Sequence, residues 1–322
     1  MVKIGIIDSG LDHKSKLRRD VIGGVSFCIE NDTMYMTDVY DDECGHGTQC
    51  AEIIKKYCEN AELYIVKIVD ESGFCDSVLL LQALEHLCDV ELDIINISLS
   101  IANDNYREQF EEVIEKLYRQ GKKINISVRN GENNSFPADV SNCYGVIGSE
   151  DETQRYKYYP KECIQIHANL YPEYVPTIDE SKQWFGGNSK ATAMMSGIMG
   201  RWIQDSDSIA DVIENNIING IDGLVETQKY QEIKDIDKKI IFDKISKALS
   251  MYYKCGTVSY DSRLWTDKEC CISDMSNFLL ELEKILQIDM NNKIITYDDM
   301  STCDRLITYL CRALREAGRE IL

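Results

Sequence analysis

Three short motifs contain the residue types that nucleophilic catalysis by serine requires. An aspartate stands in Asp8-Ser9-Gly10, a histidine in Gly45-His46-Gly47-Thr48, and a serine in Gly187-Asn188-Ser189-Lys190. A serine hydroxyl is a weak nucleophile near neutral pH. It therefore needs an imidazole to take its proton and a carboxylate to orient and stabilise that imidazole. These three side chains are candidates for those roles.

Each motif taken singly also has a structural interpretation. Asp8 fits the cap of a helix or turn after a strand, His46 fits a core histidine, and Ser189 fits a helix N-cap. Any one of the motifs is weak evidence. All three in this order, with an asparagine at a strand end between the second and the third, are improbable by chance.

The elements that must position these side chains alternate between strands and helices. Short β-branched runs predict strands at 2–7, 63–69, 94–98, 124–128, 144–148 and 164–168. Helical patterns follow at 47–57, 77–88, 105–120 and 191–202. This alternation predicts a parallel sheet with helices on both faces, a three-layer α/β/α fold. Sites in such sheets collect at the carboxyl ends of the strands, which is where Asp8 stands.

With these motifs the sequence resembles the subtilisin-like serine peptidases, whose triad runs in the chain order Asp, His, Ser. The resemblance covers about residues 1 to 217 and implies that Asp8, His46 and Ser189 are catalytic. It places Asn130 where the family has its oxyanion asparagine. It also implies a segment that pairs with extended substrate, consisting of Ser98, Leu99 and Ser100.

Asn130 has competitors for the oxyanion role. Asn-Gly is a turn signature, so Asn130-Gly131 also fits a plain turn. Asn133 and Asn134 are the nearest alternatives along the chain. If Asn130 holds the role, its amide and the backbone N–H of Ser189, at the positive end of a helix, would together stabilise the oxyanion.

Cys50 follows His46 by four residues, which is about one helical turn. Both side chains are therefore expected on the same helix face, with the thiol beneath the imidazole. Some subtilases carry a cysteine at this offset. The alternative interpretation is a small buried hydrophobic side chain without a chemical role.

Composition excludes several classes of partner. The 322 residues include 35 Lys+Arg and 55 Asp+Glu, a net charge of −20, which would repel nucleic acid and anionic membrane surfaces. No apolar run is long enough to span a membrane, and the first residues do not fit a signal peptide. Thirteen cysteines, an odd number without a Cys-x-x-Cys pair, favour free thiols in a reducing cytosol. The chain is expected to be cytoplasmic.

No cofactor or catalytic metal is predicted. The acidic run Asp41-Asp42-Glu43 could hold a structural calcium ion, as several subtilase loops do, but a solvated face is the simpler expectation.

The pattern changes after Gly200, where strands disappear. We predict a peptidase domain at 1–225, a linker at 226–237 and a small all-α bundle at 238–322, with amphipathic helices at 239–253, 275–286 and 302–317. The bundle resembles acyl or peptidyl carrier proteins. Their phosphopantetheine serine would stand at Met275, and Ser276 is one position late. A helical docking module without the prosthetic group is therefore expected.

These features predict an intracellular subtilisin-like serine endopeptidase that processes a selected peptide, for example by removing the leader of a natural-product precursor. Its partners would be a peptide or protein substrate and an enzyme docked by the C-terminal domain. Two alternatives remain: a non-catalytic protein that captures an extended peptide by strand addition, and a scaffold whose function lies in the helical domain.

Overall fold

The structure is a computed structural model of the whole chain. It describes residues 1–101, 104–151, 153–206, 212–224, 233–252, 257–264, 272–288, 295 and 298–319. The chain divides into two units. The first comprises Met1–Tyr171, Val175–Ser181 and Phe185–Val225, and the second comprises Pro172–Tyr174, Lys182–Trp184 and Glu226–Leu322.

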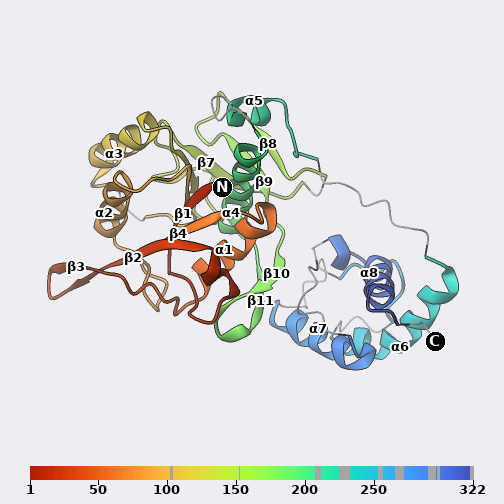
Figure 1. Cartoon of the computed structure of the whole chain (residues 1–322). Coiled ribbons are helices and arrows are strands. Elements are labelled where there is room, and N and C mark those ends of the chain that lie inside the picture. Colours follow the sequence, from red (N-terminus) through yellow and green to blue (C-terminus); the bar gives the residue numbers. More distant parts are fainter. Residues whose placement is uncertain are drawn as a thin grey trace. The chain divides into compact units, whose positions relative to one another are not determined.

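A single sheet organises the first unit (Figure 1). Its nine strands in the described residues are β1 (Lys3–Asp8), β2 (Val21–Glu30), β3 (Thr33–Thr37), β4 (Glu62–Lys67), β5 (Ile94–Ile97), β6 (Lys123–Ser127), β7 (Tyr144–Ser149), β8 (Tyr156–Tyr158) and β9 (Ile166–Asn169). They lie in the order β3-β2-β4-β1-β5-β6-β7-β9-β8. Neighbours from β2 to β9 pair in parallel, while β3 and β8 add antiparallel edges. The predicted parallel sheet is confirmed.

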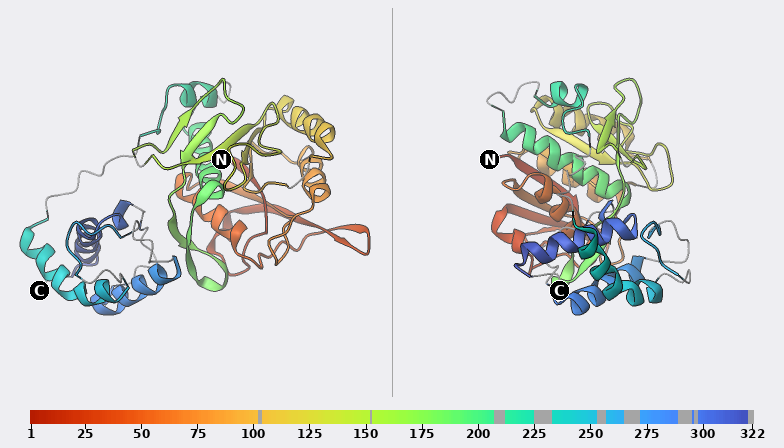
Figure 2. Two further views of the ribbon diagram at one scale, coloured as in Figure 1. Left: turned by 180° about the vertical axis from the view of Figure 1, so that it is seen from behind. Right: turned by 90° about the vertical axis from the view of Figure 1, so that its right-hand side faces the viewer.

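Helices cover both faces of this sheet (Figure 2). They are α1 (His46–Tyr57), α2 (Ser77–Leu87), α3 (Arg107–Arg119), α4 (Gly187–Gln204) and α5 (Val212–Ile218). Side chains of β1 point alternately to two cores: Ile4 and Ile6 pack with α1, α4 and α5, whereas Ile7 packs with α2 and α3. This alternation follows from the strand period of two, and it produces the three layers that the sequence predicts.

The second unit is helical and has its own core. Its helices are α6 (Asp235–Tyr252), α7 (Ile272–Leu286), the short 3-10 turn η3 (Asp298–Met300) and α8 (Cys303–Glu316). The apolar faces of these helices bury Ile241, Ile245, Leu249, Phe278, Leu282, Leu306, Ile307 and Leu310. The same core includes Trp184 from the hairpin β10 (Glu173–Pro176) and β11 (Lys182–Phe185), which we did not predict.

The predicted boundary and carrier motif are only partly within the described residues. Helix α6 begins at Asp235, inside the expected linker 226–237, and residues 225–232 lie outside the described residues. Met275 and Ser276 lie near the start of α7, but their side chains are also outside the described residues. The carrier-like assignment therefore stays a prediction. None of the described helices combines the length and apolarity that spanning a bilayer requires.

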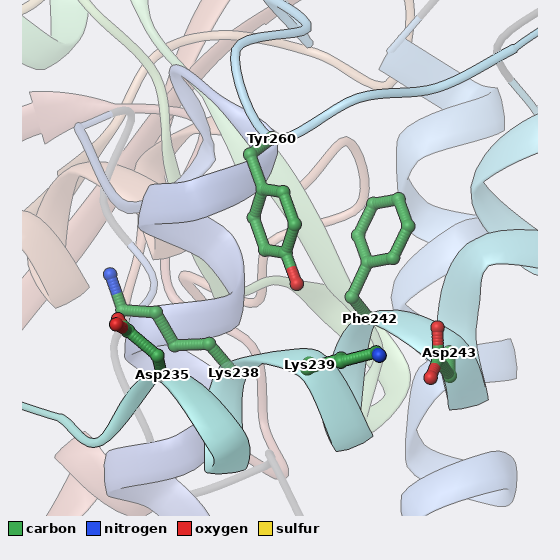
Figure 3. A pocket seen from close by; sticks show the side chains of 6 residues that line it. All are labelled: Asp235, Lys238, Lys239, Phe242, Asp243 and Tyr260. Carbon is green, nitrogen blue, oxygen red and sulfur yellow. The ribbon is translucent and has the colours of Figure 1, made fainter.

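Helix α6 carries a pocket of about 500 Å³ (Figure 3). Residues spaced three and four apart on this helix line it together with a tyrosine from the following loop: Asp235, Lys238, Lys239, Phe242, Asp243 and Tyr260. The rings of Phe242 and Tyr260 stack with their centroids 4.6 Å apart. Lys238 pairs with Asp304 at 2.8 Å, and Lys239 is an exposed residue. The pocket thus offers an aromatic wall and charges of both signs.

Candidate active site

Asp8 and His46 meet at the carboxyl end of the central strand β1. Asp8 is the last residue of β1 and is 1% exposed, and His46 is the first residue of α1. The imidazole Nδ1 lies 2.7 Å from Asp8 Oδ1, while 36% of the histidine side chain is exposed to solvent. A carboxylate on Nδ1 fixes the proton there, so Nε2 is the basic atom left for chemistry.

Gly47 makes this contact possible. A Cβ at this position would lie 2.4 Å from the carbonyl oxygen of Gly10 and 3.2 Å from Cβ of Asp8. Any other residue would push the first turn of α1 away from the end of β1. The glycine after the histidine is therefore a requirement of close packing between helix and strand.

Asp42 anchors the start of α1. Its carboxylate accepts hydrogen bonds from the backbone N–H of Gly45 (2.8 Å) and Thr48 (2.9 Å) and from Thr48 Oγ1 (2.7 Å). Burial alone would raise the pKa of Asp42, but these hydrogen bonds outweigh it, and the pKa lies below 3.8. The ionised side chain thus holds the turn that presents His46.

The charge of Asp8 also sets the basicity of His46. Burial favours the neutral imidazole, but the adjacent carboxylate of Asp8 opposes this and raises the pKa of His46 well above 6.5. A more basic imidazole accepts a proton more readily. The imidazole also needs a higher pH to become deprotonated.

Cys50 completes the surroundings of Asp8. The thiol is 0% exposed and donates to Asp8 Oδ2 at 3.5 Å, and its sulfur lies 3.9 Å from His46 Nδ1. Burial, followed by the charge of Asp8, raises the pKa of Cys50 to about 11, so the thiol stays protonated. The expected position beneath His46 is where the structure places it, and the side chain is both a buried apolar group and a hydrogen-bond partner of Asp8.

Ser189 lies in the first turn of α4, and helices α1 and α4 both contribute to the core on one face of the sheet. Its hydroxyl donates to the carbonyl oxygen of Ser98 at 3.0 Å, and the Ser98 hydroxyl donates back to the carbonyl oxygen of Ser189 at 3.1 Å. A hydroxyl has one proton and a carbonyl only accepts, so this proton is directed at Ser98. Attack by Ser189 would require a rotation that turns this proton toward the imidazole.

Asn130 lies beside the same helix start. Its Oδ1 accepts a hydrogen bond from the backbone N–H of Asn188 at 3.1 Å. Because a backbone N–H can only donate, the amide oxygen must face it, and Nδ2 is left as a donor for a ligand. Asn133 and Asn134 lie in the loop that follows and are exposed, as is Asn130. The link to α4 distinguishes Asn130 from these two.

Asn188 is a residue of the site that our sequence reasoning missed. Its side chain donates to Val128 O at 2.8 Å and accepts from the Gly148 N–H at 2.8 Å. The side chain thereby ties the residue before the candidate nucleophile to the residue after β6 and to β7. Its place within the serine motif was the available signal. Phe185, which lies edge-on to the His46 ring at 5.3 Å, had no such signal.

The expected substrate segment directly follows β5. Ser98 is 2% exposed, and both its hydroxyl and its carbonyl are bonded to Ser189, while Leu99 and Ser100 are half-buried. Ser98 therefore contacts the candidate nucleophile Ser189 directly. A role of the three residues in substrate binding stays a prediction.

The acidic run 41–43 is occupied by the protein's own donors. Asp41 pairs with Arg18, Glu43 pairs with Lys67, and Asp42 caps α1 as described above. Among the described residues, the cluster of His, Cys, Asp and Glu with three ligand atoms within 4.8 Å of one another consists of Asp8, His46 and Cys50. That cluster consists of two members of the candidate triad, Asp8 and His46, and the protonated thiol of Cys50.

Curated relatives match part of the chain. The minor extracellular protease Epr of Bacillus subtilis (strain 168) is 28% identical over 165 residues, 48% of this chain and 24% of the relative. Subtilisin E of the same organism is 32% identical over 107 residues, 30% of this chain and 26% of the relative. The matched regions thus span about a quarter of the length of these relatives.

Solved structures share the fold. The S41 psychrophilic protease superposes with a TM-score of 0.56 at 17% identity, covering 67% of this chain and 82% of that chain. A lanthipeptide protease superposes with a TM-score of 0.52 at 18% identity, covering 66% and 78%. The model of the Subtilase family matches residues 1–219, the region that carries all the motifs of the site. The chain therefore belongs to the subtilase family.

Proposed function

We propose that this protein is a serine endopeptidase whose reaction is carried out by Asp8, His46, Ser189 and Asn130. The supporting observation is the pair formed by the buried carboxylate of Asp8 and the half-exposed imidazole of His46, 2.7 Å apart. The pair leaves Nε2 as a base at the protein surface. Family membership and the serine in the first turn of α4 support the same assignment.

In the proposed reaction, Ser189 Oγ turns from Ser98 and bonds to the peptide carbonyl carbon, while its proton passes to His46 Nε2. Asp8 holds the Nδ1 proton and stabilises the imidazolium. The carbonyl oxygen becomes an oxyanion, which Asn130 Nδ2 and the Ser189 N–H stabilise at the positive end of α4. The C–N bond then breaks, and the leaving amine takes the proton from His46. Water releases the acyl group by the same steps.

We further propose that the enzyme processes a selected peptide and does so inside the cell. A second unit with its own core and an aromatic pocket favours recognition of a particular substrate or partner enzyme. One structural neighbour is a lanthipeptide protease, which is consistent with leader removal from a peptide precursor. The ten described cysteines are free thiols, in keeping with a reducing compartment.

Reaction with a fluorophosphonate probe tests the proposed chemistry. We expect one covalent adduct on the intact protein, located at Ser189, and none on Ser189→Ala. His46→Ala should fold normally and lose labelling and hydrolysis together, since loss of the triad costs on the order of 10⁶ in turnover. Wild-type protein that resists the probe but binds an extended peptide would favour the non-catalytic alternative.

The selectivity is tested at the pocket on α6. Phe242→Ala removes half of the aromatic pair and should raise KM for the natural precursor while leaving KM for a short generic peptide unchanged. Leu280→Ala, a change at an exposed residue of α7, is the control. Equal effects of Phe242→Ala on both substrates would show that the pocket does not recognise the precursor.

A further inference from the structure

A buried chain of side-chain hydrogen bonds leads from the nucleophile into the centre of the sheet. Asn96, the third residue of β5, donates from Nδ2 to Ser98 Oγ at 2.9 Å. Ser98 Oγ in turn donates to the carbonyl oxygen of Ser189 at 3.1 Å, and Ser98 O accepts from Ser189 Oγ at 3.0 Å. The backbone and the hydroxyl of the nucleophile are therefore both held by one residue, which Asn96 orients.

The other end of the Asn96 amide is bonded to the same helix. Its Oδ1 accepts from Ser196 Oγ at 2.9 Å, and Ser196 Oγ accepts from Asn125 Nδ2 at 2.9 Å. Ser196 follows Ser189 on α4 by about two helical turns, so both face the sheet. Asn125 is the partner of Asn96 in the parallel register of β5 and β6.

Burial makes this chain of bonds directional. Asn96, Asn125 and Ser196 are 0% exposed and Ser98 is 2% exposed, so water does not compete for their donors and acceptors. An amide has distinct oxygen and nitrogen ends, and Asn96 uses each for a different partner. A rotation or slide of α4 along β5 would break bonds at both ends, whereas purely apolar contacts would tolerate a small slide.

We infer that Asn96 is a positioning residue for Ser189, acting through Ser98 at the nucleophile and through Ser196 two turns further along α4. This inference rests on the proposed function, because positioning has meaning only if Ser189 reacts. The bonds set the height and rotation of the first turn of α4 against β5. They thereby set the position of Ser189 Oγ when its hydroxyl turns from the Ser98 carbonyl to His46.

The expected effect lies in the chemical step. A displacement of about 1 Å at a reacting atom can cost about 100-fold in rate. We therefore expect Ser98→Ala, which removes the relay hydroxyl and keeps the Ser98 carbonyl, to lower kcat by about 10- to 100-fold. KM should change little. The rate of labelling by a small fluorophosphonate should fall in parallel, since the probe needs the nucleophile but few substrate contacts.

Three further variants separate positioning from general damage. Asn96→Ala should lower kcat like Ser98→Ala, and the double variant should lose no more than the worse single variant, because both changes break one chain. Ser196→Ala cuts the chain at its other end and decides the question if the other variants do not fold. Ser26→Ala is the matched control. Ser26 is a buried serine on β2 whose hydroxyl shares a hydrogen bond with Thr37 Oγ1 at 2.9 Å, away from Ser189, so kcat should be unchanged.

The pH profile separates a displaced Ser189 from an altered base. His46 contacts Asp8 and Cys50, and Cys50 in turn meets Ser98, so the variant at the far end of the chain of bonds is the one to use. The pKa on the acid side of kcat/KM should be the same in Ser196→Ala as in wild type. Folded Ser98→Ala and Ser196→Ala with wild-type kcat and labelling rates would overturn the inference. So would a fully additive double variant. A wild-type protein that fails to react with the probe would instead reject the proposed function.

Discussion

Asn130 offers the sharpest test of the site, because its two amide atoms have separate partners. Oδ1 accepts from the Asn188 N–H at 3.1 Å, and Nδ2 is the proposed donor to the oxyanion. Asn130→Ala removes both. Loss of one oxyanion donor costs roughly 3–4 kcal/mol in the transition state, or about 10²- to 10³-fold in kcat. KM should change little, since the donor acts on charge that develops only during reaction.

Asn130→Asp isolates the donor. An aspartate keeps an oxygen for the Asn188 N–H, so the start of α4 stays tethered, but it has no N–H for the oxyanion and brings a negative charge beside it. We expect its free energy of unfolding in urea to match that of wild type. Its kcat on a chromogenic peptide should be at or below that of Asn130→Ala. Wild-type kcat in Asn130→Asp would refute the assignment and direct attention to Asn133.

Four other outcomes are expected. The imidazole of His46 becomes neutral only when the pH exceeds its raised pKa, so kcat/KM should rise with pH around a value above 6.5. A rise centred below 6.5 would contradict the proximity of Asp8. A mercurial that reaches Cys50 should displace His46 and abolish the proposed hydrolysis, and Cys50→Ala should be resistant to the mercurial. Inhibition that persists in this variant would place the reactive thiol elsewhere. With a net charge of −20, peptides with distant cationic residues should show higher kcat/KM at low salt and lose the advantage as salt rises; equal values at low salt would exclude steering. Coenzyme A with a promiscuous phosphopantetheinyl transferase should leave the mass unchanged, and a gain of one phosphopantetheine at Ser276 or Ser273 would show that Met275 is not the motif position.

The sequence predicts the frame of the site well, because strong signals coincide there. The β-branched run that ends at Asp8 and the helix that begins at His46 are both local patterns, and the sheet brings their ends together. The i, i+4 offset placed Cys50 beneath the imidazole for the same reason: one helical turn fixes the direction of a side chain.

The parts that escaped prediction depend on contacts between distant segments. The strand β2 contains two glycines and the strand β3 is mostly exposed, so neither has the apolar alternation by which a strand is recognised. By its position in the sequence, Trp184 falls within the predicted peptidase domain, but its side chain packs in the core of the helical unit. Asn96 and Ser196, which are 100 residues apart, carry no local pattern that joins them.

The carboxylate of Asp42 has a consequence for the behaviour of the protein in acid. A carboxyl whose pKa is lower in the folded chain stabilises the fold above its unfolded pKa, and this contribution disappears only as the pH falls through the folded value, here below 3.8. His46 becomes protonated at a much higher pH. Between the pKa of Asp42 and the pKa of His46, Asp42 is still ionised and holds the turn that presents His46. The imidazole is protonated in this range and cannot act as a base. Mild acid should therefore abolish the proposed hydrolysis while this turn stays intact, and neutralisation should restore hydrolysis without refolding of the turn.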